Sequence, residues 1–68
     1  MTYKLILNGT EQLLSDNLDE SIKFAQICLK TAYNESNQFQ SGTITKDNQP
    51  IYRIIAQKGE IITTKIAE

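Results

Sequence analysis

Residues 17–33, NLDESIKFAQICLKTAY, carry the pattern of a helix with a single apolar side. Asn17 is a favourable N-cap residue, and Glu20, three residues later, has the spacing of a capping box. The apolar residues recur at intervals of three and four, so they fall in one stripe along a helix. They are Leu18, Ile22, Ala25, Leu29, Ala32 and Tyr33. We therefore predict a helix over residues 18–33 whose apolar stripe faces the core.

The residues before this helix have the period of a strand. Tyr3, Leu5 and Leu7 alternate with the residues between them, as side chains do on one face of a sheet. Asn8-Gly9 follows, and this pair favours a two-residue hairpin turn because both residues tolerate positive φ. A short second strand over residues 10–14 would then pair with the first. The alternative is a helix that already begins near residue 10.

Three further strands are expected in the C-terminal third. Their centres are residues 43–45, 51–56 and 61–66, and they are separated by the turn-forming residues 46–49 and 57–60. Pro50 is restricted to the start of a strand or to an edge. These strands complete an α+β fold of one domain, residues 1–68. We predict a two-layer sandwich with one helix on a mostly antiparallel sheet, in the order β-(β)-α-β-β-β.

Two registers are open to the last hairpin. A two-residue turn at Lys58-Gly59 pairs Ile55 with Ile62, whereas a three-residue loop pairs Ile55 with Ile61. A slip of one residue moves every side chain of the strand to the other face. We favour the three-residue loop because it keeps all charged residues of this hairpin away from the helix. It places Ile62, Thr64 and Ile66 against the helix and leaves Ile61, Thr63 and Lys65 outside.

The composition offers little for chemistry. The 68 residues contain no His and no Trp, and Cys28 is the only cysteine. A catalytic base beside a nucleophile and a zinc site are therefore not expected, and we predict no cofactor. We interpret Cys28 as a small apolar residue at the flank of the helix stripe, and Asp16, Asp19 and Glu20 as helix-capping residues. The sequence favours a cytoplasmic protein that is not an enzyme and has no membrane partner.

The sheet face away from the helix is the predicted interaction surface. It should carry four aliphatic residues ringed by basic groups, which is the composition of an interface core with a charged rim. The predicted partner-binding residues are Ile6, Ile51, Arg53, Ile55, Ile61 and Lys65. The expected function is a small non-enzymatic protein-interaction module. Its partner would be another protein or a second copy of itself, with a homodimer favoured.

The sequence offers two further candidate surfaces. Phe24 and Ile27 are three residues apart on the helix and point away from its apolar stripe. The alternative function is a nucleic-acid-binding module in which Lys4, Arg53 and Lys65 contact phosphate. The net charge of −1 disfavours it, since nucleic-acid-binding domains normally carry a basic surplus.

Overall fold

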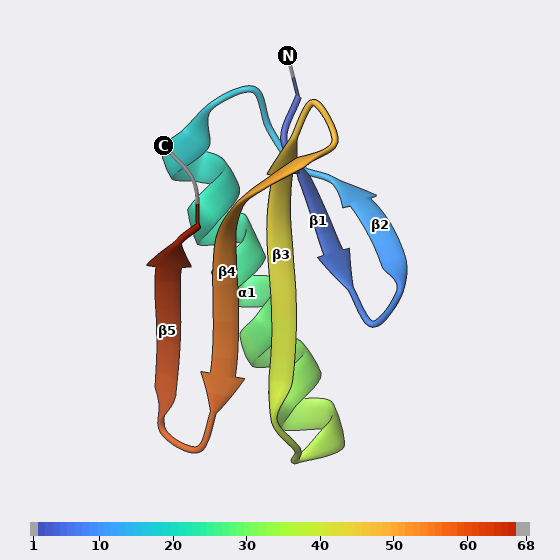
Figure 1. Ribbon diagram of the computed structural model, residues 1–68. Coiled ribbons are helices and arrows are strands. Elements are labelled where there is room, and N and C mark those ends of the chain that lie inside the picture. The colour runs from blue at the N-terminus through green and yellow to red at the C-terminus, as the bar shows by residue number, and fades with distance from the viewer. Residues whose placement is uncertain (1, 67–68) are drawn as a thin grey trace.

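One helix packs on one face of a five-stranded antiparallel sheet in the computed structural model, which describes residues 2–66 (Figure 1). The chain order β-β-α-β-β-β is the predicted one, and residues 10–13 form a strand rather than an early helical turn. The elements are β1 (Lys4–Leu7), β2 (Thr10–Leu13), α1 (Leu18–Ser36), β3 (Gln40–Lys46), β4 (Gln49–Gln57) and β5 (Glu60–Lys65).

Helix α1 begins and ends at asparagines. The side-chain oxygen of Asn17 accepts a hydrogen bond from the Glu20 amide over 3.0 Å, as expected of an N-cap. At the other end Asn37 adopts a left-handed conformation with φ 57°, and its amide donates to the Tyr33 carbonyl. The helix therefore extends to Ser36, one turn beyond the predicted end, because the polar residues after Tyr33 complete a C-terminal cap. No other helix occurs in residues 2–66, and α1 lacks the apolar length needed to cross a membrane.

Two of the three hairpin turns contain asparagine in the left-handed region. Asn8 and Gly9 have φ of 53° and 77°, and Asp47 and Asn48 have φ of 54° and 64°. Positive φ at both central residues defines the turn type that best matches strand twist. The first hairpin has the predicted two-residue turn, with Leu5 opposite Gln12.

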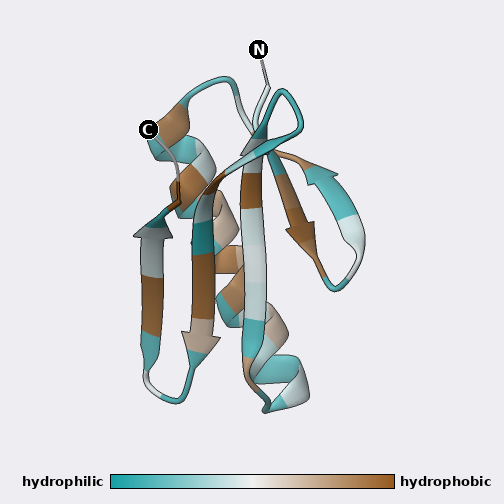
Figure 2. Ribbon diagram, in the orientation of Figure 1, coloured by the Kyte–Doolittle hydropathy of each residue, from teal (hydrophilic) through white to brown (hydrophobic). Residues whose placement is uncertain are grey.

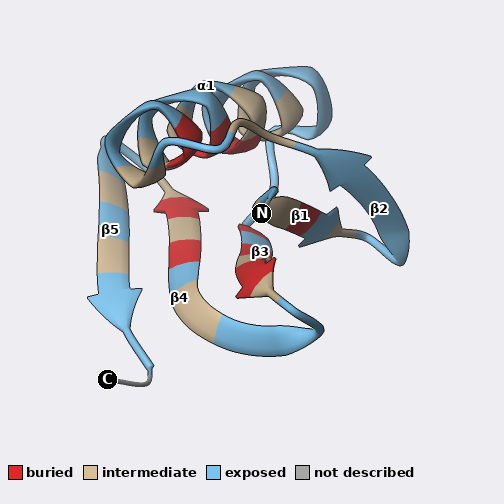
Figure 3. Cartoon of the chain, turned by 90° about the horizontal axis from the view of Figure 1, so that it is seen from above, coloured by how far each residue is buried: buried red, intermediate tan, exposed pale blue. Residues whose placement is uncertain are grey.

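The strands are arranged in the order β2-β1-β3-β4-β5, so β3 is central and β2 and β5 are the edges. Figure 3 shows that the buried residues lie on α1, β1, β3 and β4, while the two edge strands contribute none. Figure 2 shows hydrophobic segments on the helix, β1 and β4, and also on β5, which has no buried residue. The core side chains are Leu5, Ala25, Leu29, Ile44, Ile54 and Ala56, and Ile22 is partly buried against them.

Helix and sheet approach closely at Gly42 on β3. A Cβ atom added there would lie 3.0 Å from Leu29 Cδ2 and 3.1 Å from Leu5 Cδ1, and both leucines are fully buried. These distances are shorter than normal van der Waals contacts. Glycine at this position therefore sets the spacing between the two layers.

The predicted three-residue loop between β4 and β5 is wrong. Gln57 pairs with Glu60 and Ile55 pairs with Ile62, so the turn contains only Lys58 and Gly59. Gly59 has φ 76°, whereas Lys58 is not in the positive-φ region. Because paired residues of antiparallel strands share a face, Ile61, Thr63 and Lys65 lie on the helix side, with Ala56, Ile54 and Tyr52. Ile62 and Thr64 lie on the opposite face. The prediction that Ile62 packs against the helix is therefore wrong.

The charged residues of this hairpin do not distinguish the two registers. Both registers keep Arg53 on the face away from the helix, and only Lys65 moves. Lys65 is the last residue of an edge strand and stays exposed, so its position on the helix side buries no charge. A polar contact supports this register, since Gln26 on the helix donates a hydrogen bond to Thr63 over 2.9 Å.

A β-bulge interrupts the pairing of β3 with β4. Ile44 pairs with Tyr52 and Thr45 pairs with Pro50, so Ile51 has no partner on β3. Ile51 is partly buried and packs against the core. Its carbonyl accepts a hydrogen bond from the Ile66 amide over 2.8 Å.

Candidate interaction surface

The structure separates the six residues predicted to form one surface. Ile6, Arg53 and Ile55 lie on the sheet face away from α1, which we call the outer face. Ile61 and Lys65 lie on the helix side because β5 is shifted by one residue relative to the expected register. Ile51 is held at the bulge against the core. The expectation that these six residues share the outer face is therefore wrong for three of them.

The outer face carries an aliphatic pair that joins the predicted residue Ile55 to Ile62, which was expected on the helix side. Ile62 lies directly opposite Ile55 across β4 and β5 and is 37% exposed. Ile6 on β1 is 39% exposed, and Thr43 of β3 lies between it and Arg53 of β4. We call Ile6, Ile55 and Ile62 the outer-face cluster. The register with a two-residue turn at Lys58-Gly59 predicts Ile62 on this face, whereas the three-residue loop does not.

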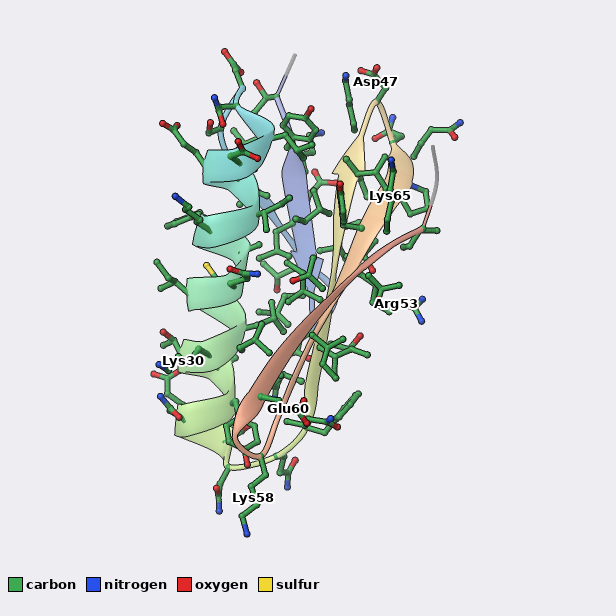
Figure 4. The ribbon with its side chains drawn as sticks, turned by 90° about the vertical axis from the view of Figure 1, so that its left-hand side faces the viewer. Lys30, Asp47, Arg53, Lys58, Glu60 and Lys65 are labelled. Carbon is green, nitrogen blue, oxygen red and sulfur yellow. The ribbon has the colours of Figure 1, made fainter. Side chains whose placement is uncertain are left out.

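Polar and charged residues lie beside and between the members of the outer-face cluster. Lys4 and Glu11 form an ion pair of 3.5 Å at the β1–β2 end of the face. Arg53 is exposed and points away from the helix (Figure 4). In the part of the chain that the structure describes, Arg53 forms no ion pair. The outer face thus carries exposed aliphatic residues interspersed with charged ones, and both kinds of residue occur in protein interfaces.

The basic residues of the nucleic-acid alternative do not form one surface. Lys4 and Arg53 lie on the outer face, whereas Lys65 lies on the helix side. Lys4 is already paired with Glu11. Tyr52 of β4, an aromatic residue that could stack on a base, is partly buried against the core.

Helix α1 exposes the two apolar residues noted in the sequence, and they lie in different surroundings. Ile27 is 60% exposed and Phe24 is 44% exposed. Ile27 lines a hollow of about 420 Å³ between the helix and β5, together with Lys23, Gln26, Lys30 and Ile61. Phe24 does not line this hollow. A second hollow of about 320 Å³ lies beside the Lys58-Gly59 turn and shares Lys30 and Ile61 with the first, so both open along the β5 edge.

The remaining polar residues have structural roles. Thr2 donates to Asp16 over 3.0 Å, and Ser15 donates to Glu20 over 3.2 Å at the helix start. Cys28 is partly buried against the core, and desolvation by burial raises the pKa of its thiol. Residues 2–66 contain no group of three potential metal ligands among His, Cys, Asp and Glu.

The comparisons with known proteins found no match among family models, curated sequences or solved structures. A functional argument for this chain rests on its own surfaces.

Proposed function

We propose that this chain is a small non-enzymatic protein-interaction module that self-associates through its outer face. The observation that carries this proposal is the Ile55–Ile62 pair, two aliphatic residues directly opposite each other on an uncovered sheet face. A strand pair of this kind usually gains stability by packing against another layer. Here the second layer, α1, covers only the other face.

Self-association would supply what a domain of this size lacks. The buried core consists of six side chains, two of them alanines. Small domains commonly add a disulfide, a metal or a second subunit to such a core. A fully buried Ile contributes roughly 1.5–3 kcal/mol. Members of the outer-face cluster are already partly buried, so each would contribute less than this on association.

A two-fold axis through the outer face would bring the same cluster from two copies together. In such an interface each residue meets its counterpart or a neighbour of it on the other copy. The Lys4–Glu11 ion pair neutralises the β1–β2 end of the outer face. Arg53 is therefore the charge on this face whose interactions a second copy would change most. A second copy of this chain is the partner that we propose for the outer face.

The test is the solution mass measured by sedimentation over a wide range of protein concentration. The wild-type chain should dimerise, and Ile62→Lys should remain monomeric at the same concentrations while keeping the helical circular dichroism signal. The matched control is Arg53→Glu, which should alter the salt dependence of dimerisation more than its affinity. A wild-type chain that stays monomeric at high concentration, with Ile62→Lys changing neither its stability nor any binding, would show that the outer face is only solvated.

The nucleic-acid alternative gives the opposite ranking in the same set of variants. Charge reversal at Lys4 or Arg53 would then weaken binding of a single-stranded oligonucleotide, and Ile62→Lys would be tolerated. That ranking would replace the present proposal.

A further inference from the structure

The free edge of β5 presents a regular set of backbone groups. In an antiparallel pair, hydrogen-bonded and non-hydrogen-bonded residue pairs alternate. Since the Ile66 amide donates to the Ile51 carbonyl, the even-numbered residues of β5 direct their backbone toward β4. The amides and carbonyls of Ile61, Thr63 and Lys65 therefore point to the open edge. An extended chain beside β5 could form backbone hydrogen bonds with these three residues.

This edge is basic on a chain whose net charge is −1. Lys58 occupies the turn before β5, Lys65 ends the strand, and Lys23 and Lys30 line the hollow beside Ile61. In Figure 4, which looks onto this edge, Lys58 lies at the turn before β5, Lys65 lies toward the opposite end, and Lys30 lies on the helix. Two acidic residues accompany the four lysines. They are Glu60 on β5 and Asp19, which lies one helical turn before Lys23.

Among residues 2–66, no carboxylate forms an ion pair with any of these four lysines. Over residues 2–66, the pair of Lys4 with Glu11 is the one ion pair within 4.0 Å. Asp19 and Glu60 are thus close in sequence to lysines without binding them. The electrostatic potential at this edge is therefore positive, and it would attract an acidic partner.

The space beside the edge is suited to side chains. The hollow of about 420 Å³ has Ile27 and Ile61 as its apolar lining, with Lys23 and Lys30 as its charged lining. A strand added to β5 would direct alternate side chains over this hollow, because residues of one face recur with period two.

We propose that the β5 edge binds an extended acidic segment of a partner protein as a sixth strand of the sheet. The backbone of Ile61, Thr63 and Lys65 supplies the pairing, which is strand addition. The partner segment carries carboxylates on the side facing Lys23 and Lys30, alternating with aliphatic residues. This site is separate from the dimer proposed on the outer face.

A second copy of this chain is a poor occupant of this edge. Pairing with a second β5 strand would place the four lysines of another copy beside the first four, with no carboxylate-rich segment to neutralise them. The other free edge, β2, offers Glu11 as its acidic residue, and Lys4 already binds it. The charge of the site therefore selects a foreign acidic segment.

The experiment uses the full chain and a short synthetic peptide of alternating Glu and Val. Binding is followed by NMR titration and by amide hydrogen exchange. We expect slowed exchange at the amides of Ile61, Thr63 and Lys65, because these point to solvent in the free protein. The same peptide N-methylated at alternate residues, so that it cannot complete the ladder, should not bind. A peptide of alternating Lys and Val is the charge control and should also not bind.

Variants of the chain separate backbone pairing from charge. Thr63→Pro removes an outward amide but no hydrogen bond to β4, and Thr63→Ala is its control because both lose the hydroxyl. Thr63→Pro should abolish peptide binding and Thr63→Ala should retain it. Lys23→Glu combined with Lys30→Glu should weaken binding on the order of tenfold, because two favourable surface pairs become repulsive.

Three outcomes would overturn the proposal. The first is an absence of peptide binding by the folded wild-type chain. The second is binding without protection of the three edge amides, which would indicate charge attraction alone. The third is tighter binding of a single-stranded oligonucleotide than of the peptide, with the same dependence on Lys23 and Lys30. Because no test variant touches the outer-face cluster, failure here leaves the dimer proposal standing.

Discussion

The side-chain amide of Gln26 donates a hydrogen bond to the hydroxyl of Thr63 over 2.9 Å and joins the helix to the edge strand β5. The two residues are 37 positions apart in the sequence. This contact exists only in the register with a two-residue turn, because the other register would turn Thr63 to the outer face. It thus marks which side of β5 faces the helix.

Replacing Thr63 by Val should lower the free energy of unfolding by about 1 kcal/mol, because Gln26 loses its hydrogen-bond partner while the shape of the side chain is kept. Thr64→Val is the control, since Thr64 is exposed on the outer face. That change should alter stability by less than about 0.5 kcal/mol. Urea denaturation measures both variants. A larger loss for Thr64→Val would mean that the strand register is the reverse of the one described.

Gly42→Ala should destabilise the fold by about 1–3 kcal/mol, because the added methyl group overpacks a filled contact. Leu29 Cδ2 and Leu5 Cδ1 lie 3.0 and 3.1 Å from the position of that methyl group, and neither leucine has free surface into which it could move. Ser41→Ala, at an exposed neighbouring position of β3, is the control. Thermal unfolding compares the two. Equal stability for both variants would show that the helix can shift away from the sheet without cost.

Cys28 should react slowly with alkylating reagents in the native protein. Burial raises the pKa of its thiol above the ordinary value of 9.0, so less thiolate is present at a given pH than in the unfolded chain. The rate of alkylation by iodoacetamide should therefore reach its half-maximum at a higher pH in buffer than in urea. Faster alkylation of the native protein than of the unfolded chain would reveal a reactive thiol.

The same shift determines the sign of the pH dependence of stability. The pKa of the Cys28 thiol is higher in the folded protein than in the unfolded chain. The contribution of the neutral thiol to the free energy of unfolding is therefore fully present below the pKa of the unfolded chain. It is lost as pH rises through the folded pKa. Stability should thus fall slightly above pH 9.0 in the wild-type chain, and this part of the fall should be missing in Cys28→Ser. The substitution itself should cost no more than about 1–2 kcal/mol.

Features that depend on neighbours a few residues apart could be predicted from the sequence. The N-cap of α1 needs only Asn17 and the Glu20 amide, and the first turn needs only Asn8 and Gly9 in left-handed conformations. The apolar stripe on the helix predicted the side that faces the sheet, and Ala25 and Leu29 of this stripe are fully buried. Local geometry allows few alternatives at such sites, which is why the order of helix and strands followed from the residues alone.

Which residues form the candidate surface depends on contacts between strands and helix that are far apart in the sequence. Ile61 and Ile62 are adjacent and chemically identical, so the pattern of apolar residues could not decide which of them faces the helix. Ile51 resembled any other strand residue until the bulge opposite Ile44 and Thr45 turned it against the core.

Only the tertiary structure decided the composition of the outer face and the exposure of the β5 edge. A slip of one residue exchanges the two faces of a strand, and its energy is set by contacts with distant elements. Lys65 shows the reason most clearly. Its position on the helix side is acceptable because β5 is the last strand of the sheet and the side chain stays in solvent. The order of the strands is a property of the whole chain, whereas the tendency of each segment to form a helix, a strand or a turn is already present in its own residues.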